Sequence, residues 1–151
     1  MGADRATRRR RPGRLGVKPL VGAVLLDTTV LIDILRGRPD AVERLSAIRR
    51  AADIPYTSAV NVEEVVRGLR DKELDRARLL FTGLRTAPLD VEEGVQAGRW
   101  RRDHARRGLT LSQADCLIAA AAVGVGATLA TGNPKHFPMR GLRVEHWVVG
   151  A

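Results

Sequence analysis

The chain has 151 residues, of which 44% are apolar and 28% charged, with two Trp, two Phe and one Tyr. This length predicts one compact domain, and the composition excludes a collagen-like, wholly disordered or transmembrane chain. The few aromatic residues leave a core of Leu, Val, Ile and Ala, and they argue against an aromatic-rich sheet that stacks on RNA bases.

The net charge of +9 is concentrated at the N-terminus, where residues 1–20 carry seven Lys or Arg and one Asp. The remaining 131 residues carry 19 basic and 16 acidic side chains. We therefore expect residues 1–20 to be a disordered basic extension, and residues 21–151 to form the folded domain. The extension either contacts phosphate groups or has no role of its own. The single Cys116 excludes an intramolecular disulfide and a Cys-based zinc site, and it fits a cytoplasmic protein.

Short apolar runs alternate with amphipathic segments from residue 23 onwards. In chain order, the pattern predicts strands at 23–26, 55–58, 86–89, 127–130 and 142–149, and helices at 29–36, 40–51, 62–69, 73–84, 90–107 and 112–123. Because strands and helices alternate, we expect an α/β domain with a central parallel sheet of four or five strands and helices on both faces.

Acidic side chains follow the predicted strands. Asp27 comes directly after the first strand, Glu63 and Glu64 follow the second, and Asp115 lies in the first turn of a later helix. Since the carboxyl ends of parallel strands form the ligand crevice of an open sheet, we expect these acids to converge with Asn133 after the fourth strand. Their repulsion would then require a hard divalent cation such as Mg²⁺ or Mn²⁺, which prefers oxygen ligands. Such a site favours attack of water on a phosphodiester.

Helix capping offers an alternative explanation for each of these residues, because acids and amides are favoured in first helical turns. The capping candidates are Asp27 for the helix 29–36, Asp40 for the helix 40–51, Asn61 with Glu64, and either Ser112 with Asp115 or Thr110 with Gln113. Capping does not require an acid at the end of the first strand, nor two neighbouring Glu residues. The set as a whole therefore favours a metal site.

Four segments, in this order, resemble a PIN-domain ribonuclease. They are residues 24–33 (VLLDTTVLID), 58–68 (SAVNVEEVVRG), 115–121 (DCLIAAA) and 127–137 (ATLATGNPKHF). More narrowly, the chain resembles the VapC toxins of bacterial toxin–antitoxin pairs from about residue 23 to residue 149. The resemblance implies a PIN-like fold and a Mg²⁺-dependent endoribonuclease, for which Mn²⁺ can substitute, that hydrolyses RNA with a carboxylate-bound metal and an activated water. It also implies a homodimer and a cognate VapB-type antitoxin as partner.

The same resemblance assigns roles to individual residues. It makes Asp27, Glu64 and Asp115 the metal ligands, with Asn133 as a fourth catalytic residue where many members carry Asp. An amide lacks a charge, so the number of metal ions, one or two, stays open. The supporting hydroxyls are Thr28 or Thr29 beside the first acid and Thr131 at the end of the fourth strand, and the further candidates are Asp33 and Glu63.

Other interpretations of the site find less support in the residues. A phosphatase of the haloacid dehalogenase type needs a second Asp where Thr29 stands, and a glycine-rich nucleotide loop would need Gly in place of Leu129. Cys116 is expected to be buried packing rather than a nucleophile. We expect structural or surface roles for the three histidines, His104, His136 and His146.

Two alternatives remain open on the sequence. Trp100, in a helix rich in Arg, either packs in the core beneath a solvated helix face or contacts RNA near the site. At the level of the whole protein, the non-enzymatic alternative is a basic α/β module that binds RNA or a partner and whose acids only cap helices.

Overall fold

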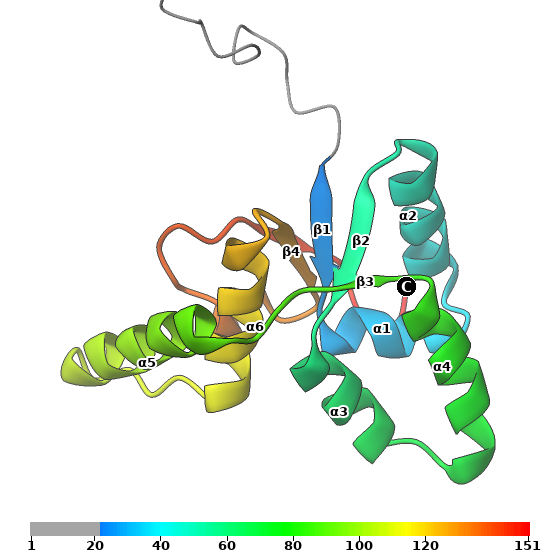
Figure 1. The fold of residues 1–151 in the computed structure, drawn as a ribbon. Helices are drawn as coiled ribbons and strands as arrows, with labels where there is room; N and C mark the ends of the chain where they lie inside the picture. The colour runs from blue at the N-terminus through cyan, green and yellow to red at the C-terminus, as the bar shows by residue number, and fades with distance from the viewer. Residues whose placement is uncertain (1–21) are drawn as a thin grey trace, which may run out of the picture.

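The computed structural model describes residues 22–151, and the predicted basic extension at residues 1–20 lies outside this range. Figure 1 shows the described strands and helices around one central sheet. The strands are β1 (Ala23–Leu26), β2 (Ile54–Thr57), β3 (Arg85–Thr86), β4 (Thr128–Thr131) and β5 (Val144–His146), and the α-helices are α1 (Thr28–Leu35), α2 (Pro39–Arg50), α3 (Ala59–Arg67), α4 (Leu74–Thr82), α5 (Val91–Arg106) and α6 (Gln113–Gly124). Two short 3₁₀ helices, η1 (Asp71–Glu73) and η2 (Pro134–His136), complete the described elements.

The strands of residues 22–151 form one five-stranded sheet in the order β3-β2-β1-β4-β5, and every neighbouring pair is parallel. β1 is the central strand, with Leu25 opposite Tyr56 of β2 on one side and Leu129 of β4 on the other. The predicted parallel α/β sheet is confirmed. Its consequence for the site is that the ends of β1, β2 and β4 meet at a single edge.

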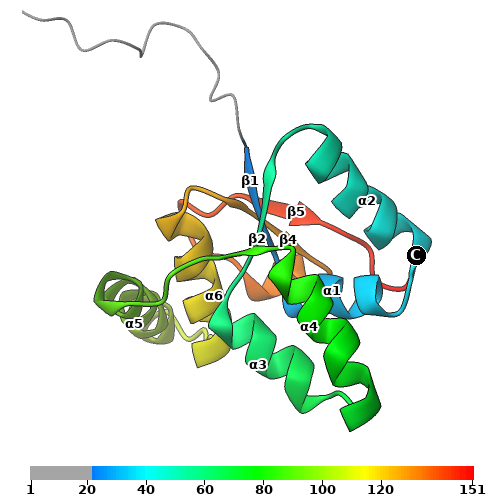
Figure 2. The ribbon, with the colours of Figure 1, turned by 45° about the vertical axis from the view of Figure 1, so that its right-hand side comes forward.

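Helices cover both faces of the sheet and bury a separate apolar core on each side. Side chains alternate along a strand, so Leu25 packs with residues of α5 and α6 such as Ile118, whereas Leu26 packs with residues of α1, α2 and α3 such as Leu31 and Val65. Figures 1 and 2 show α5 and α6 on one side of the sheet and α1, α2 and α4 on the other. The two helical layers therefore reach the carboxyl edge of the sheet from opposite sides.

The two outer strands are shorter than predicted. The third strand, predicted at 86–89, is confined to Arg85–Thr86 because Pro88 has no N–H for a ladder; the last bond of this region runs from the Ala87 N–H to the Thr57 carbonyl at 2.8 Å. The fifth strand, predicted at 142–149, covers Val144–His146. It ends where the backbone N–H of Trp147 donates to the Thr131 carbonyl at 2.9 Å.

Helix boundaries agree with the predictions to within a few residues, with two physical differences. α2 begins at Pro39, which has no N–H to satisfy, so the residue that precedes the helix is Arg38 and the predicted cap Asp40 lies in its first turn. The helix predicted at 73–84 begins instead as the 3₁₀ turn η1. Gly37 follows α1 with φ of +68°, a conformation that suits glycine, and it ends the helix where expected. Among the described residues, no helix combines the length and apolar character that crossing a membrane requires.

Leu26 tests the apolar core beneath the central strand. Leu26→Ala is expected to lower the free energy of unfolding by about 2–5 kcal/mol, because it empties a fully buried position in the middle of the sheet. Urea unfolding followed by circular dichroism measures the change. The matched control is Leu79→Ala, at a side chain that is 75% exposed, where the change should stay within about 0.5 kcal/mol. Equal effects of the two substitutions would contradict this assignment of the core.

Candidate functional site

Asp27 lies at the carboxyl end of the central strand and is only 6% exposed. It occupies the position that precedes α1, but its side chain makes no capping bond there. Instead, Oδ2 accepts a hydrogen bond from the Thr131 hydroxyl at 2.7 Å, and Oδ1 accepts one from the Asn61 amide at 3.3 Å. The capping explanation for this carboxylate is therefore wrong, and its partners come from the end of β4 and from the first turn of α3, the helix that follows β2.

Ser58, rather than Asn61, caps α3. The Ser58 hydroxyl oxygen accepts from the Asn61 backbone N–H at 3.3 Å and donates to the Asn61 side-chain oxygen at 2.6 Å. The predicted Asn61–Glu64 capping box is thus wrong. With its oxygen occupied by Ser58, the fully buried Asn61 amide directs its Nδ2 to both Asp27 and the Thr28 hydroxyl, the latter at 3.2 Å.

Thr28 connects this network to Glu64. The Thr28 hydroxyl donates to Glu64 Oε1 at 2.8 Å, and the other Glu64 oxygen lies 3.9 Å from the Arg67 guanidinium. Glu63 points elsewhere: its carboxylate pairs with Arg67 Nε at 3.1 Å and is 62% exposed. Of the two neighbouring glutamates, the structure brings Glu64 and not Glu63 into contact with the residues around Asp27.

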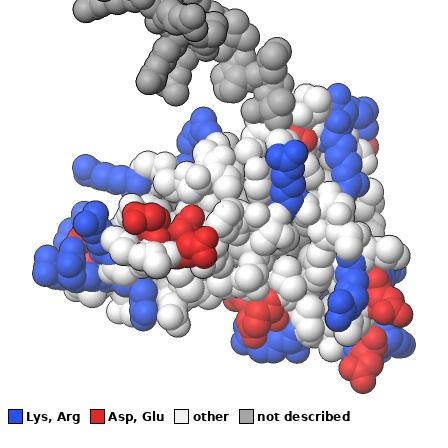
Figure 3. Space-filling model, in the orientation of Figure 1, with Lys and Arg blue, Asp and Glu red and all other residues white. Residues whose placement is uncertain are grey.

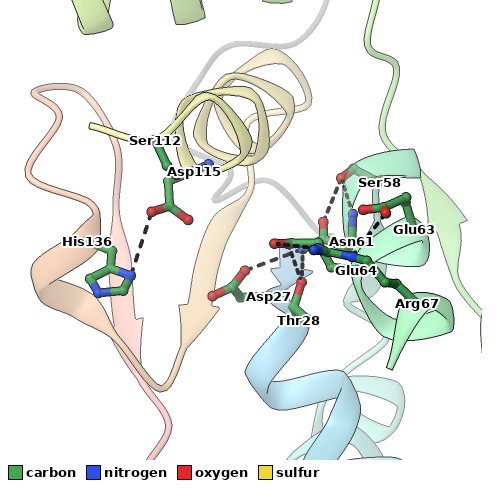
Figure 4. A network of polar contacts seen from close by, with 10 residues as sticks. All are labelled: Asp27, Thr28, Ser58, Asn61, Glu63, Glu64, Arg67, Ser112, Asp115 and His136. Carbon is green, nitrogen blue, oxygen red and sulfur yellow. Dashed lines mark hydrogen bonds and ion pairs between the residues drawn. The ribbon is translucent and has the colours of Figure 1, made fainter. Parts of the chain in front are cut away.

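Asp115 approaches Asp27 from the opposite side. Its backbone N–H donates to the Ser112 hydroxyl at 3.0 Å, so Ser112 caps α6 and the alternative pair Thr110–Gln113 does not. The Asp115 side chain is free of this cap, and its Oδ2 lies 3.6 Å from Nδ1 of His136 in η2. Figure 4 shows Asp27 between two groups of side chains, with Asp115 and His136 on one side and Glu64, Asn61 and Thr28 on the other.

The remaining predicted residues follow β4 or lie in α1. Thr131 is fully buried against Asp27, and its hydroxyl oxygen also accepts from the Asn133 backbone N–H at 3.0 Å. Asn133 itself is exposed, so the contact it makes here comes from its backbone. The Thr29 hydroxyl oxygen accepts from the Gly132 N–H at 3.0 Å. Asp33 is bonded to the Gly150 N–H at 2.8 Å, away from the group of acids.

Burial raises the pKa of the Asp27 carboxyl above its ordinary value. Hydrogen bonds from the Thr131 hydroxyl and the Thr28 backbone oppose this rise, whereas the charges of Asp115 and Glu64 add to it. Asp27 is therefore a buried acid whose ionised form is held at a cost, next to two further acids. A positive charge at this position would relieve that cost.

The donor chemistry of the site fits a hard divalent cation, because carboxylate, hydroxyl and amide oxygens converge there. In residues 22–151, however, no three His, Cys, Asp or Glu side chains are gathered closely enough to hold a metal ion. Glu64 is engaged by Thr28, and Asp115 is engaged by His136.

Three residues of this site were not recognised in the sequence. The sequence gives no signal for Ser58, and the spacing of Asn61 indicates a helix cap. Both residues follow β2 in the chain, much as Asp27 follows β1. Adjacency of β1 and β2 in the sheet was the missing information. His136 is on the surface, as expected, but its contact with Asp115 joins η2 to α6 and has no signal in residue spacing.

The structure favours one of the two interpretations of Trp100. Its side chain is partly buried and packs against the apolar core that includes residues of α6, which favours a packing role. Arginines surround it on the exposed face of α5, and Figure 3 shows basic side chains gathered over the C-terminal end of this helix. Cys116 is fully buried, as predicted, and burial raises the pKa of its thiol.

Comparison with known sequences agrees with this geometry. Residues 24–139 match the family model described as PIN domain. The chain is 35% identical to Ribonuclease VapC19 of Mycobacterium tuberculosis over 119 residues, which cover 76% of this chain and 92% of that protein. It is 36% identical to Ribonuclease VapC10 of the same species over 120 residues, which cover 77% and 86% respectively. The chain therefore belongs to the PIN-domain family, in the branch of the VapC ribonucleases.

Solved structures share the fold. A chain in the crystal structure of VapBC2 from Rickettsia felis, bound to a promoter DNA fragment, superposes with a TM-score of 0.74 at 20% identity, covering 83% of this chain and 98% of that one. A chain in the crystal structure of FitAcB from Neisseria gonorrhoeae superposes with a TM-score of 0.63 at 28% identity, covering 80% and 95%. The first of these likenesses concerns the fold alone.

Asn61 tests whether the polar network is an integral part of the buried structure. Asn61→Ala leaves Asp27 Oδ1 and the Thr28 hydroxyl without the amide that donates to them. We therefore expect the free energy of unfolding to fall by about 1–3 kcal/mol. Urea unfolding of the metal-free protein gives the value. Glu63→Gln, which removes only an exposed ion pair with Arg67, serves as the control and should change stability by less than about 1 kcal/mol.

Proposed function

We propose that this chain is a metal-dependent endoribonuclease that acts as the toxin of a toxin–antitoxin pair. In this proposal Mg²⁺ is the cation, Mn²⁺ can replace it, and the ligands are Asp27, Glu64 and Asp115. Asn133 is the fourth residue of the catalytic group, and Thr28 and Thr131 support the acids. The observation that carries the proposal is the buried Asp27 carboxylate with the charges of Glu64 and Asp115 on either side.

Each residue contributes a defined physical effect. Asp27 is held in one orientation by Thr131 and Asn61, which accounts for its place at the centre of the group. Thr28 positions Glu64, and the Ser112 cap fixes the first turn of α6 from which Asp115 projects. A bound divalent cation would supply charge stabilisation for the phosphodiester and lower the pKa of a water molecule. The acids supply the charge that would hold this cation.

His136 has a part in the same proposal. Its ring contacts Asp115 and is 59% exposed, so it lies at the open side of the group rather than beneath it. In this proposal the His136 imidazole would contact an RNA phosphate next to Asp115.

The partners follow from the relatives. The solved structures that share the fold include VapBC2 of Rickettsia felis and a toxin–antitoxin complex from Klebsiella pneumoniae, and we extend this to a VapB-type antitoxin for the present chain. A homodimer and a place in the cytoplasm belong to the same proposal and rest on the family resemblance. The alternative, a non-catalytic module that binds RNA or a partner, is distinguished from the nuclease by the RNA cleavage assay.

Cleavage of RNA is the direct test. Purified protein is incubated with total cellular RNA in Mg²⁺, in Mn²⁺ or in EDTA, and the fragments are resolved by gel electrophoresis and end mapping. We expect discrete fragments with either metal and none with EDTA. Asp115→Asn should lower the cleavage rate on the order of 100-fold or more, since it removes a charged ligand from the metal.

The matched control for this cleavage experiment is Asp103→Asn. It alters an acid that is 48% exposed and pairs with Arg102 and Arg106 on α5. This variant should cleave at the wild-type rate. Intact RNA in every lane with the wild-type protein would favour the binding module instead, and equal loss in both variants would remove the special role of Asp115.

Metal binding can be measured without RNA. If the acids hold a cation, Mg²⁺ or Mn²⁺ at a hundredfold excess over its Kd stabilises the folded protein by about 2.7 kcal/mol, seen as a rise in Tm. Asp27→Asn should abolish this rise, because it removes the central charge of the group, and the rise is measured against the Tm of the same variant without metal. Asp75→Asn, at an exposed position of α4, should keep the rise. A rise that persists in Asp27→Asn would place the cation elsewhere.

A further inference from the structure

Asp33 is a buried carboxylate that the proposed metal site does not use. It lies in α1, is 4% exposed, and accepts a hydrogen bond from the Gly150 N–H, 117 residues further along the chain, at 2.8 Å. Burial of an acid is costly unless its bonds are satisfied. An apolar side chain at this point of α1 would avoid that cost, so the bond to Gly150 calls for a role beyond packing.

The C-terminal segment 147–151 runs from the end of β5 across to α1 and α2, as Figure 2 shows. Several bonds hold it along this course. The Arg44 guanidinium lies 5.3 Å from the centre of the Trp147 ring, and the Asp40 N–H donates to the Ala151 carbonyl at 3.4 Å. Asp33 provides the side-chain anchor at Gly150, between these two points.

Val149 brings this segment against the loop that carries the site residues of β4. A Cβ atom added at Gly132 would overlap Cγ2 of Val149, so the valine methyl packs directly on the glycine backbone. On its other side, the Gly132 N–H is bonded to the Thr29 hydroxyl oxygen at 3.0 Å. Gly132 is therefore held between Val149 and Thr29.

Gly132 lies between two residues of the candidate site. Thr131, before it, donates its hydroxyl hydrogen to Asp27 Oδ2 at 2.7 Å and accepts from the Asn133 N–H at 3.0 Å. Any displacement of Gly132 moves these groups, because they are its direct neighbours in the chain. The contacts thus form a continuous path from Asp33 through the C-terminal segment to Asp27.

We propose that Asp33 is a positioning residue for the nuclease site: by anchoring Gly150, it holds Val149 on Gly132 and so fixes Thr131 and Asn133 relative to Asp27. This inference rests on the proposed function for its effect on cleavage. The path itself consists of contacts that can be tested without any activity.

The experiment compares Asp33→Ala with Asp33→Asn in the full chain. The asparagine keeps an oxygen that accepts from the Gly150 N–H, whereas alanine does not. We expect Asp33→Ala to lower kcat for RNA cleavage by about 10-fold or more while KM stays within about twofold of the wild-type value, as for loss of a group that orients a metal ligand. Asp33→Asn should keep kcat close to that of the wild type. Asp40→Ala removes an exposed acid whose contact with the segment comes from its backbone, and it should cleave as the wild type does.

Amide hydrogen exchange followed by NMR separates positioning from general stability. In Asp33→Ala, exchange should accelerate at Gly132, Asn133 and Gly150 and stay unchanged in α6. Faster exchange throughout the protein, an unchanged kcat in Asp33→Ala, or a defect of equal size in Asp33→Asn would each overturn the inference. Amide exchange is measured without RNA. A wild-type protein that cleaves no RNA would therefore refute the proposed function, while exchange at Gly132 would still test whether Asp33 positions the loop after β4.

A second variant keeps the inference testable if Asp33→Ala does not fold. Val149→Ala preserves the Asp33–Gly150 bond and removes the methyl that packs on Gly132. It should lower kcat and accelerate exchange at Gly132 while Gly150 stays protected. Wild-type kcat and exchange in this variant would break the path at its middle step and overturn the inference.

Discussion

The arrangement of the site depends on one constraint, the burial of the Asp27 carboxylate, whose oxygens must be hydrogen-bonded by the groups around it. Asp27 ends the central strand of a parallel sheet, and the ends of both flanking strands supply groups that contact it: Thr131 from β4 and, one turn into α3, Asn61. These neutral donors hold its orientation without cancelling its charge. The charges of Asp115 and Glu64 make the same position more unfavourable for an anion, and a cation is the group that would relieve it.

The acids around Asp27 come from opposite faces of the sheet. Glu64 belongs to α3, which packs with the core under Leu26, and Asp115 belongs to α6, which packs with the core under Leu25. A cation shared among them would add a further link between the two helical layers, which already meet where α3 contacts α6. Each acid also has a local partner: Glu64 contacts the Thr28 hydroxyl and the Arg67 guanidinium, and Asp115 contacts His136.

Much of the fold could be predicted from the sequence because the apolar runs are short, regular and separated by clear helix stops such as Gly37. The central strands were placed to within a residue, since a run such as Ala23–Leu26 is apolar, has the length of a strand and is followed by the polar Asp27. The outer strands were not, because where pairing ends depends on a neighbour that the sequence does not name. The role of Asn61 was misread for a similar reason: spacing along α3 suits a cap, and only the adjacency of β1 and β2 turns its amide toward Asp27.

The hydrogen bond between Asp27 and Thr131 spans 104 residues, and this distance has a consequence for protein synthesis. At elongation rates of 5–20 residues per second, roughly 5–20 s pass between the synthesis of the two partners, during which β1 lacks its neighbour β4. Glu64 and its helix are made early in this interval, and Asp115 late. The group of acids with its Thr131 contact therefore cannot be completed on a short partial chain, so under the proposed function a nascent copy would not cleave RNA until most of the domain has been made.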